Sequence, residues 1–226
     1  MTDIKVISFD LDDTLYDNGP VIHNAFIALY NFLCAHYPKV ADHFDFDGFL
    51  KNAHQIKHEH QEIVDLHKLR HLHINTILTS SGYPKVATDP AYQVFIKARQ
   101  QVDLYPVGLE ILKHLKKHYK IISISNGNAD PNQIGLGDFI EQSFNPANTG
   151  FAKPDPRIYS HCCDQLNIAP QQMLHIGDCL NNDFYAAQEA SCKALWLNLN
   201  NSDSPEQPQF NSLILLKEYL NDSLIP

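Results

Sequence analysis

Short apolar runs alternate with stretches of helical period along much of this chain, and this alternation is the feature that most limits its fold. Four runs rich in β-branched and apolar residues are predicted to be buried strands: 4–11, 120–126, 173–178 and 193–198. Helical period follows in three segments, 107–119, 157–167 and 182–191. Strand and helix repeated in this order predict an α/β fold with a doubly wound, Rossmann-like parallel sheet that helices cover on both faces.

A helical block interrupts this alternation soon after the first predicted strand. Four segments between residues 21 and 101 have helical period, and none of them resembles a strand: 21–37, 46–60, 62–80 and 90–101. We therefore predict an α/β core of residues 1–16 and 102–226, with an inserted all-helical cap domain of residues 17–101 lying over it. The polar tract 198–209 is expected to be a surface connection.

Composition restricts the partners and the compartment of the protein. The 226 residues carry a formal net charge of -9, which argues against nucleic acid because proteins that bind it collect Lys and Arg. Five cysteines without a CxxC pair suggest neither a disulfide framework nor a zinc site, so a reducing cytoplasm is expected. The chain starts without the pattern of a signal peptide and has no apolar run of about 20 residues, so we expect no membrane partner. A monomer or a homodimer is expected.

Polar side chains follow three of the predicted strands. Asp10 and Asp12 come after the first, Ser125 and Asn126 after the second, and Asp178 after the third, with Asp183 five residues further on; Lys153 lies between the last two of these strands in an Ala-Lys-Pro sequence. In open parallel sheets, ligands bind beyond the carboxyl ends of the strands, near the point where strand order reverses. These side chains are therefore expected to form one site.

The acidic residues of this set suggest a metal and a phosphate. Asp10 and Asp12, two residues apart in an extended segment, tend to point the same way, and Asp178 adds a third acid. Clustered carboxylates repel one another unless a cation lies between them, and Mg²⁺ is the usual cation when phosphate is present. With the metal and Lys153 neutralising the phosphoryl oxygens, Asp10 can attack phosphorus and Asp12 can give a proton to the leaving oxygen.

The sequence resembles the haloacid dehalogenase-like hydrolases with a helical cap after the first motif. The resemblance rests on four ordered segments: Asp10-Leu-Asp-Asp-Thr14, Ile121 to Asn126, Lys153-Pro154, and Gly177-Asp178 with Asp183. It implies a magnesium-dependent phosphomonoesterase with Asp10 as nucleophile and Asp12 as general acid and base. The backbone carbonyl of Asp12 would also bind the metal. Ser125 and Asn126 would contact phosphate, Lys153 would orient it, Asp178 would be a metal ligand, and Asp183 would contact the metal or its water.

A closer likeness, to bacterial phosphatases of flavin mononucleotide and of the phosphoribitylaminouracil precursor of riboflavin, is carried by two core loops. These are Phe9 to Asn18, and Ser125 to Ala129 with Gly135 to Phe139. Residues beside the motifs are candidates for contact with the substrate: Tyr16, Asn18, Gly127 and Asn128. Arg70 in the helical block is a further candidate, because its forked donor suits a phosphate or a ring carbonyl.

Several alternatives remain open from the sequence. A phosphomutase would use the same residues, and a haloacid dehalogenase would share the fold but has no need of Asp12. A phosphoacceptor of the receiver type or a binding protein without turnover belongs to a different class. The pairs His54 and His58, and His67 and His71, have the spacing of helical metal ligands, but no Cys or Glu completes a motif, so we expect neutral imidazoles on a polar face.

Overall fold

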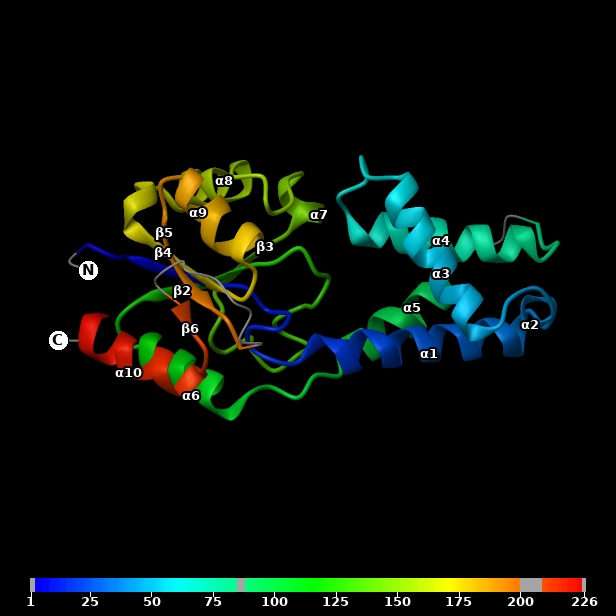
Figure 1. The fold of residues 1–226 in the computed structure, drawn as a ribbon, viewed down its shortest axis with the longest axis horizontal. Helices are drawn as coiled ribbons and strands as arrows, with labels where there is room; N and C mark the ends of the chain where they lie inside the picture. The colour runs from blue at the N-terminus through cyan, green and yellow to red at the C-terminus, as the bar shows by residue number, and fades with distance from the viewer. Residues whose placement is uncertain (1–2, 85–87, 200–208, 225–226) are drawn as a thin grey trace. The chain divides into compact units, whose positions relative to one another are not determined.

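The computed structural model describes residues 3–84, 88–199 and 209–224, and its chain divides into two compact units. One consists of Met1–Asp17 and Asp103–Pro226, and the other is Asn18–Val102 (Figure 1). Most of the polar tract 198–209 lies outside the described residues. No helix in the described part of the chain is both long and apolar enough to cross a membrane.

The first unit is built on a parallel sheet, which confirms the predicted fold class. Its strands are β1 (Val6–Phe9), β2 (Lys120–Ile124), β3 (Gln142–Phe144), β4 (Met173–Gly177), β5 (Lys193–Leu197) and β6 (Gln209–Phe210), in the order β3-β2-β1-β4-β5-β6. The chain moves outward from β1 through β2 to β3 and then crosses back to pair β4 with β1. Strand order therefore reverses beside β1, and the carboxyl ends of β1, β2 and β4 meet there.

Helices cover both faces of this sheet (Figure 1). They are α6 (Pro106–Leu115), α7 (Pro146–Thr149), α8 (Arg157–Leu166), α9 (Ala186–Glu189) and α10 (Leu213–Leu224), with a 3₁₀ turn at Pro170–Gln172. In Figure 1, α8 and α9 lie on one face and α6 and α10 on the other. On the first face, Ile122 and Ile124 of β2 pack in one apolar core with Ile158 and Cys162 of α8. Burying such side chains is worth about 1.5–3 kcal/mol each.

The predicted helix 182–191 is not a single α-helix. A π-helical turn, Leu180–Tyr185, comes first and α9 follows it. The carbonyl oxygen of Cys179 accepts from the backbone N–H of both Asp183 and Phe184, at 2.8 and 3.4 Å, which widens the turn. Such π-turns often occur at functional sites.

The second unit, Asn18–Val102, is helical throughout its described secondary structure. It contains α1 (Asn18–His36), α2 (Lys39–His43), α3 (Phe46–Glu59), α4 (Leu66–Ser80) and α5 (Asp89–Arg99). α4 begins four residues later than the predicted segment 62–80, because the Asp65 carboxylate accepts from the His67 N–H and caps the helix there. The short α2 was not predicted. Leu29 and Leu33 of α1 and Ile77 of α4 are fully buried in the core of this unit.

Candidate active site

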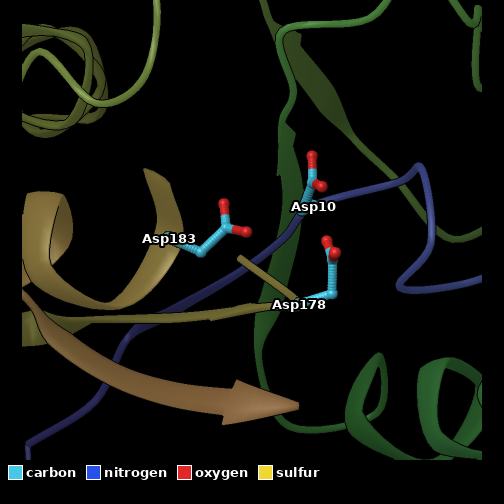
Figure 2. Close-up of side chains that lie close together, drawn as sticks. All are labelled: Asp10, Asp178 and Asp183. Carbon is cyan, nitrogen blue, oxygen red and sulfur yellow. The ribbon is translucent and has the colours of Figure 1, made fainter. Parts of the chain in front are cut away.

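A pocket of about 280 Å³ opens where β1, β2 and β4 end. Three carboxylates converge there, Asp10 directly after β1, Asp178 directly after β4 and Asp183 from the π-helical turn (Figure 2). The residues that line the pocket are Asp10, Asp12, Asp13, Ser125, Asn126, Gly127, Lys153, Asp178, Cys179, Asn182 and Asp183. All of them belong to the α/β unit.

Asp10 is a buried carboxylate fixed at the end of the central strand. Its backbone N–H donates to the Ile176 carbonyl at 2.9 Å, and its side chain is only 10% exposed. Lys153 Nζ lies 2.8 Å from Asp10 Oδ1, but no hydrogen bond of acceptable geometry reaches this buried oxygen. Burial raises the pKa of Asp10 well above its ordinary value, although Lys153 opposes the shift. The negative charge of Asp10 is therefore only partly compensated in this structure.

Lys153 supplies the positive charge of the pocket. Its ammonium lies between Asp10 and Asp183, 2.8 and 2.5 Å from one oxygen of each, and its side chain is 3% exposed. Burial alone would lower the pKa of Lys153, but the two carboxylates raise it above its ordinary value, so the ammonium stays charged. The Asn126 amide holds the lysine backbone through two bonds, donating to the Lys153 carbonyl at 2.7 Å and accepting from its N–H at 2.8 Å.

Asp183 is held in place by donors. Its Oδ1 accepts from Lys153 Nζ, and its Oδ2 accepts from the Cys179 backbone N–H at 2.9 Å. Burial alone would raise the pKa of Asp183, but Lys153 and His175 lower it well below its ordinary value. A Cβ atom on Gly177 would lie 2.3 Å from the Asp183 carboxyl carbon, so only glycine leaves room for this carboxylate.

A buried hydrogen-bond chain continues behind Asp183 into the sheet. His175 Nε2 lies 3.0 Å from Asp183 Oδ1, and Nδ1 lies 2.8 Å from the hydroxyl oxygen of Ser8, its register partner on β1. Burial lowers the pKa of His175, so the ring is neutral at neutral pH. Because the ionised Asp183 can only accept, Nε2–H donates to it and Nδ1 accepts from Ser8. Neither Ser8 nor His175 was predicted as a site residue; what marks them in the sequence is a polar side chain in the middle of an otherwise apolar strand.

Asp12 and Asp178 complete the acidic lining. The Tyr16 hydroxyl donates to Asp12 Oδ1 at 2.5 Å, and the Thr14 hydroxyl donates to Asp178 Oδ1 at 3.3 Å. Burial, together with the charges of Asp183 and Asp13, raises the pKa of Asp178 to about 6. A carboxylate with such a pKa is one that a bound cation would stabilise in its ionised form.

The donor set fits a hard divalent cation such as Mg²⁺. Asp10, Asp178 and Asp183 each offer one carboxylate oxygen, and these three oxygens lie within 4.8 Å of one another. Oxygen ligands of this kind are those that Mg²⁺ prefers, and Asp10 is buried with no hydrogen-bond donor of acceptable geometry on its Oδ1, so a cation would add compensating charge there. Asp183 already accepts from three donors, so Asp10 and Asp178 are better placed to bind the ion directly.

The structure brings the sequence-predicted motif residues together in one pocket and leaves other candidates elsewhere. Gly127 lines the pocket, and its N–H donates to the Ser125 hydroxyl oxygen at 3.0 Å. Tyr16 and Asn128 are buried and do not line the pocket. Asn18 and Arg70 belong to the helical unit rather than to the unit that carries the pocket. The lining also includes three residues that were not predicted: Asp13, Cys179 and Asn182.

The histidine pairs of the helical unit do not form a metal site among the described residues. His67 Nδ1 contacts the Tyr92 hydroxyl, and His71 Nδ1 lies 2.7 Å from the Thr88 hydroxyl oxygen. The one His, Cys, Asp and Glu group with metal-binding spacing in the described part of the chain is the acidic group of the pocket.

Three comparisons relate the chain to known proteins. The family model of haloacid dehalogenase-like hydrolases matches residues 4–191. The chain is 29% identical over 205 residues to 5-amino-6-(5-phospho-D-ribitylamino)uracil phosphatase YigB of Escherichia coli, covering 88% of this chain and 86% of the relative. It is 27% identical to glyceraldehyde 3-phosphate phosphatase of Pyrococcus furiosus, covering 87% and 81%. Among solved structures, the 2-haloacid dehalogenase from Pseudomonas syringae superposes with a TM-score of 0.86 at 28% identity, covering 97% of this chain and 99% of that one.

Proposed function

The chain belongs to the haloacid dehalogenase-like hydrolases, and on this premise we propose that it is a magnesium-dependent phosphatase that works through a phosphoaspartyl intermediate on Asp10. Hydrolase and phosphatase activity is common to this family and to the curated relatives, including those from Escherichia coli and Pyrococcus furiosus. The observation that carries the finer proposal is Asp10, a buried carboxylate 2.8 Å from a charged lysine within a cluster of acids.

The proposed reaction has two steps. In the first, Asp10 attacks phosphorus, the bond to the ester oxygen breaks, and Asp12 gives the leaving oxygen a proton. In the second, Asp12 takes a proton from water, which attacks phosphorus and releases phosphate from Asp10. The hydrogen bond from Tyr16 supports the role of Asp12 because it fixes the orientation of the carboxyl group.

The remaining pocket residues are proposed to bind the phosphoryl group. Lys153 and the Ser125 hydroxyl would donate to its oxygens, and Asn126 would act by holding the Lys153 backbone. Mg²⁺ would be held by Asp10, the Asp12 backbone carbonyl and Asp178, with Asp183 near it, and would neutralise negative charge on the phosphoryl oxygens.

A dehalogenase is a weaker candidate even though the Pseudomonas syringae structure bears that name. A halide leaves without a proton, so a dehalogenase would have no use for Asp12 and its Tyr16 partner. A phosphomutase would resolve the same phosphoaspartate with a sugar hydroxyl instead of water. A phosphoacceptor or binding protein would form or bind the phosphoryl group without turnover.

The proposed substrate is a small phosphate ester in the cytoplasm. Flavin mononucleotide or a riboflavin-pathway phosphate is the first choice, because the relative from Escherichia coli is named for such a substrate. The helical unit is proposed to act as the cap that selects the ester. Excluding water from the pocket would strengthen the electrostatic interactions that stabilise the transition state. A monomer or a homodimer is proposed.

The function is tested by phosphate release with Mg²⁺ across sugar phosphates, nucleotides, flavin mononucleotide and phosphoglycolate, beside the Asp10→Asn variant. We expect release that depends on Asp10 and is strongest for one ester class. A strong preference for flavin mononucleotide would support the riboflavin assignment, and broad weak release would remove that assignment alone. No release from any ester by the wild type would contradict the phosphatase proposal.

Removing Mg²⁺ is expected to abolish activity, and the affinity for Mg²⁺ is expected to depend on pH. Because carboxylates bind metal only when ionised, protons compete with Mg²⁺ at Asp10 and Asp178, whose pKa values are raised. Lowering the pH through the Asp178 pKa of about 6 should therefore weaken Mg²⁺ binding, by roughly tenfold per pH unit below it. Titration of the enzyme with Mg²⁺ after EDTA treatment, at pH 7.5 and 5.5, measures this change. An apparent affinity that does not vary with pH would contradict a site made of these carboxylates.

His175 is predicted to position Lys153 through Asp183. In His175→Gln, the side-chain amide can place an N–H near the position of Nε2, within reach of Asp183. In His175→Asn, the shorter amide can place one only near the position of Nδ1, beside Ser8. We expect His175→Asn to lower kcat by about tenfold or more with little change in KM, because a hydrogen bond to a charged group is worth about 1.5–3 kcal/mol, and His175→Gln to retain most of kcat. Melting temperatures of both variants give the control, since a purely structural histidine would lower stability without separating their kcat values.

A further inference from the structure

The helical unit contains an arginine that lies against two aromatic rings. Arg70 of α4 has its guanidinium carbon 4.1 Å from the ring centroid of Phe26 on α1 and 4.3 Å from that of Phe95 on α5. Both phenylalanines are buried in the core of this unit. These two cation–π contacts restrict the guanidinium and leave donors on its edge for hydrogen bonding.

One histidine orients this edge without neutralising its charge. Arg70 Nη1 lies 3.2 Å from His73 Nδ1, and His73 Nε2 lies 3.2 Å from the Phe49 carbonyl oxygen. Since a carbonyl can only accept, Nε2 carries the hydrogen and Nδ1 accepts from Arg70. Burial, together with the charge of Arg70, lowers the pKa of His73 to about 3, so the ring is neutral at physiological pH.

The positive charge of Arg70 has no carboxylate partner in the part of the chain that the structure describes. Among the described residues, no Asp or Glu forms an ion pair with it, and its buried Nε has no hydrogen-bond acceptor. Burial lowers the pKa of Arg70 only to about 10, so the group is charged at neutral pH. By contrast, the exposed Arg157 lies 2.5 Å from its partner Asp155. In a chain with 26 acidic and 17 basic residues, this exposed arginine has an acid as partner, whereas Arg70 has none in the described part of the chain.

An unpaired buried charge costs free energy that an apolar side chain would not. A Leu or Met at position 70 could pack against the two rings without this desolvation. A guanidinium held by two rings and one neutral histidine, and partly exposed, instead fits an oxyanion that arrives from solution.

We propose that Arg70 forms an anion-binding site in the helical unit that takes a carboxylate or phosphate group of a small metabolite through the donors that His73 leaves free. The anion is either a second charged group of the substrate or a separate small anion. Binding of a charged group of the substrate rests on the proposed phosphatase function, whereas binding of a separate small anion does not.

Malonate, a small dicarboxylate, is the probe for this site. Its dissociation constant is measured by calorimetry with EDTA present, for the wild type, Arg70→Met and Arg157→Met. We expect saturable binding to the wild type, binding at least about tenfold weaker to Arg70→Met, and no change in Arg157→Met. Equal binding by Arg70→Met and the wild type, or no saturable binding to the wild type, overturns the proposal.

A second measurement on the wild-type protein avoids dependence on a variant that must fold. Phenylglyoxal modifies arginine, and the rate of modification at each residue can be followed by peptide mass. Malonate should slow modification of Arg70 and leave that of Arg157 unchanged. Equal rates at Arg70 with and without malonate would overturn the site even if Arg70→Met did not fold.

Kinetics then distinguish the two sources of the anion. The ratio of kcat/KM for phosphoglycolate, which has a carboxylate, to that for p-nitrophenyl phosphate, which has none, is compared between the wild type and Arg70→Met. A fall of about tenfold in this ratio assigns the anion to the substrate. An unchanged ratio with lost malonate binding assigns a separate anion. If the wild type hydrolyses neither these two esters nor any ester of the wider panel, the phosphatase proposal fails while the malonate result still decides the site.

Discussion

Replacing Asp10 by asparagine is expected to reduce phosphate release by about 10⁴-fold or more, with the fold intact. The amide has nearly the shape of the carboxylate but cannot form the phosphoaspartate. Because burial already raises the pKa of Asp10, removing its charge relieves an unfavourable burial, and the melting temperature should change little or rise. Phosphate release and thermal unfolding of the same preparation measure both effects.

Asp155→Asn is the matched control for this variant. Asp155 is an acid of the same unit, but its partner is the exposed Arg157 and it does not line the pocket. Its replacement should leave phosphate release unchanged. If Asp10→Asn kept activity within about tenfold of the wild type while folded, Asp10 would not be the nucleophile.

Lys153→Met is expected to remove both activity and stability. Activity should fall by about 100-fold or more, because the phosphoryl oxygens lose a preorganised positive charge. Removing one partner of a buried ion pair leaves uncompensated charge, here on Asp10 and Asp183, and costs about 3 kcal/mol of unfolding free energy. For a chain of this length, that corresponds to a fall in melting temperature of roughly 6–12 °C. Thermal unfolding in EDTA measures it.

The loss of stability in Lys153→Met is expected to depend on pH, in a direction that the carboxyl pKa values determine. Without Lys153, the folded-state pKa values of Asp10 and Asp183 should both lie above those of the unfolded chain. Carboxyl groups with raised folded-state pKa values favour folding at low pH and lose this contribution as pH rises through those values. The loss of unfolding free energy caused by Lys153→Met should therefore be smaller at pH 5 than at pH 8.

Lys217→Met is the matched control for Lys153→Met. Lys217 is paired with Glu110 at 2.6 Å, but both side chains are exposed, and such pairs contribute little to stability. A similar loss of stability in both variants, or a deficit of Lys153→Met that grows toward pH 5, would contradict the buried triad of Asp10, Lys153 and Asp183.

The parallel sheet could be predicted because its inner strands carry a strong signal. β1, β4 and most of β2 and β5 are buried along their length, so their sequences are continuous apolar runs. β3 and β6 gave no such signal, since they have three and two residues and lie at the sheet edges. The end of a strand is also where prediction was imprecise: the run 4–11 contains β1 but extends beyond it, because Leu11 is buried without being in the sheet.

The site could be predicted as far as its residues follow strands directly. Asp10, Ser125 and Asp178 each come after a strand of a parallel sheet, which is enough to bring them to one edge. The hydrogen-bond chain from Ser8 through His175 to Asp183 could not be predicted, because it depends on the register of β1 with β4 and on a π-helical turn. Patterns of local sequence do not encode either of these.

The phosphoaspartate on Asp10 is the central claim, and trapping it in Asp12→Asn tests it most directly. p-Nitrophenyl phosphate has a leaving group that departs without a proton, so phosphorylation should proceed in this variant while hydrolysis, which needs Asp12 as base, should slow. After an acid quench, peptide mass analysis locates any added phosphoryl group. The account predicts one phosphoryl group on Asp10, absent from the Asp10→Asn protein. A phosphoryl group on another residue, or normal turnover by Asp12→Asn with no adduct, would contradict it.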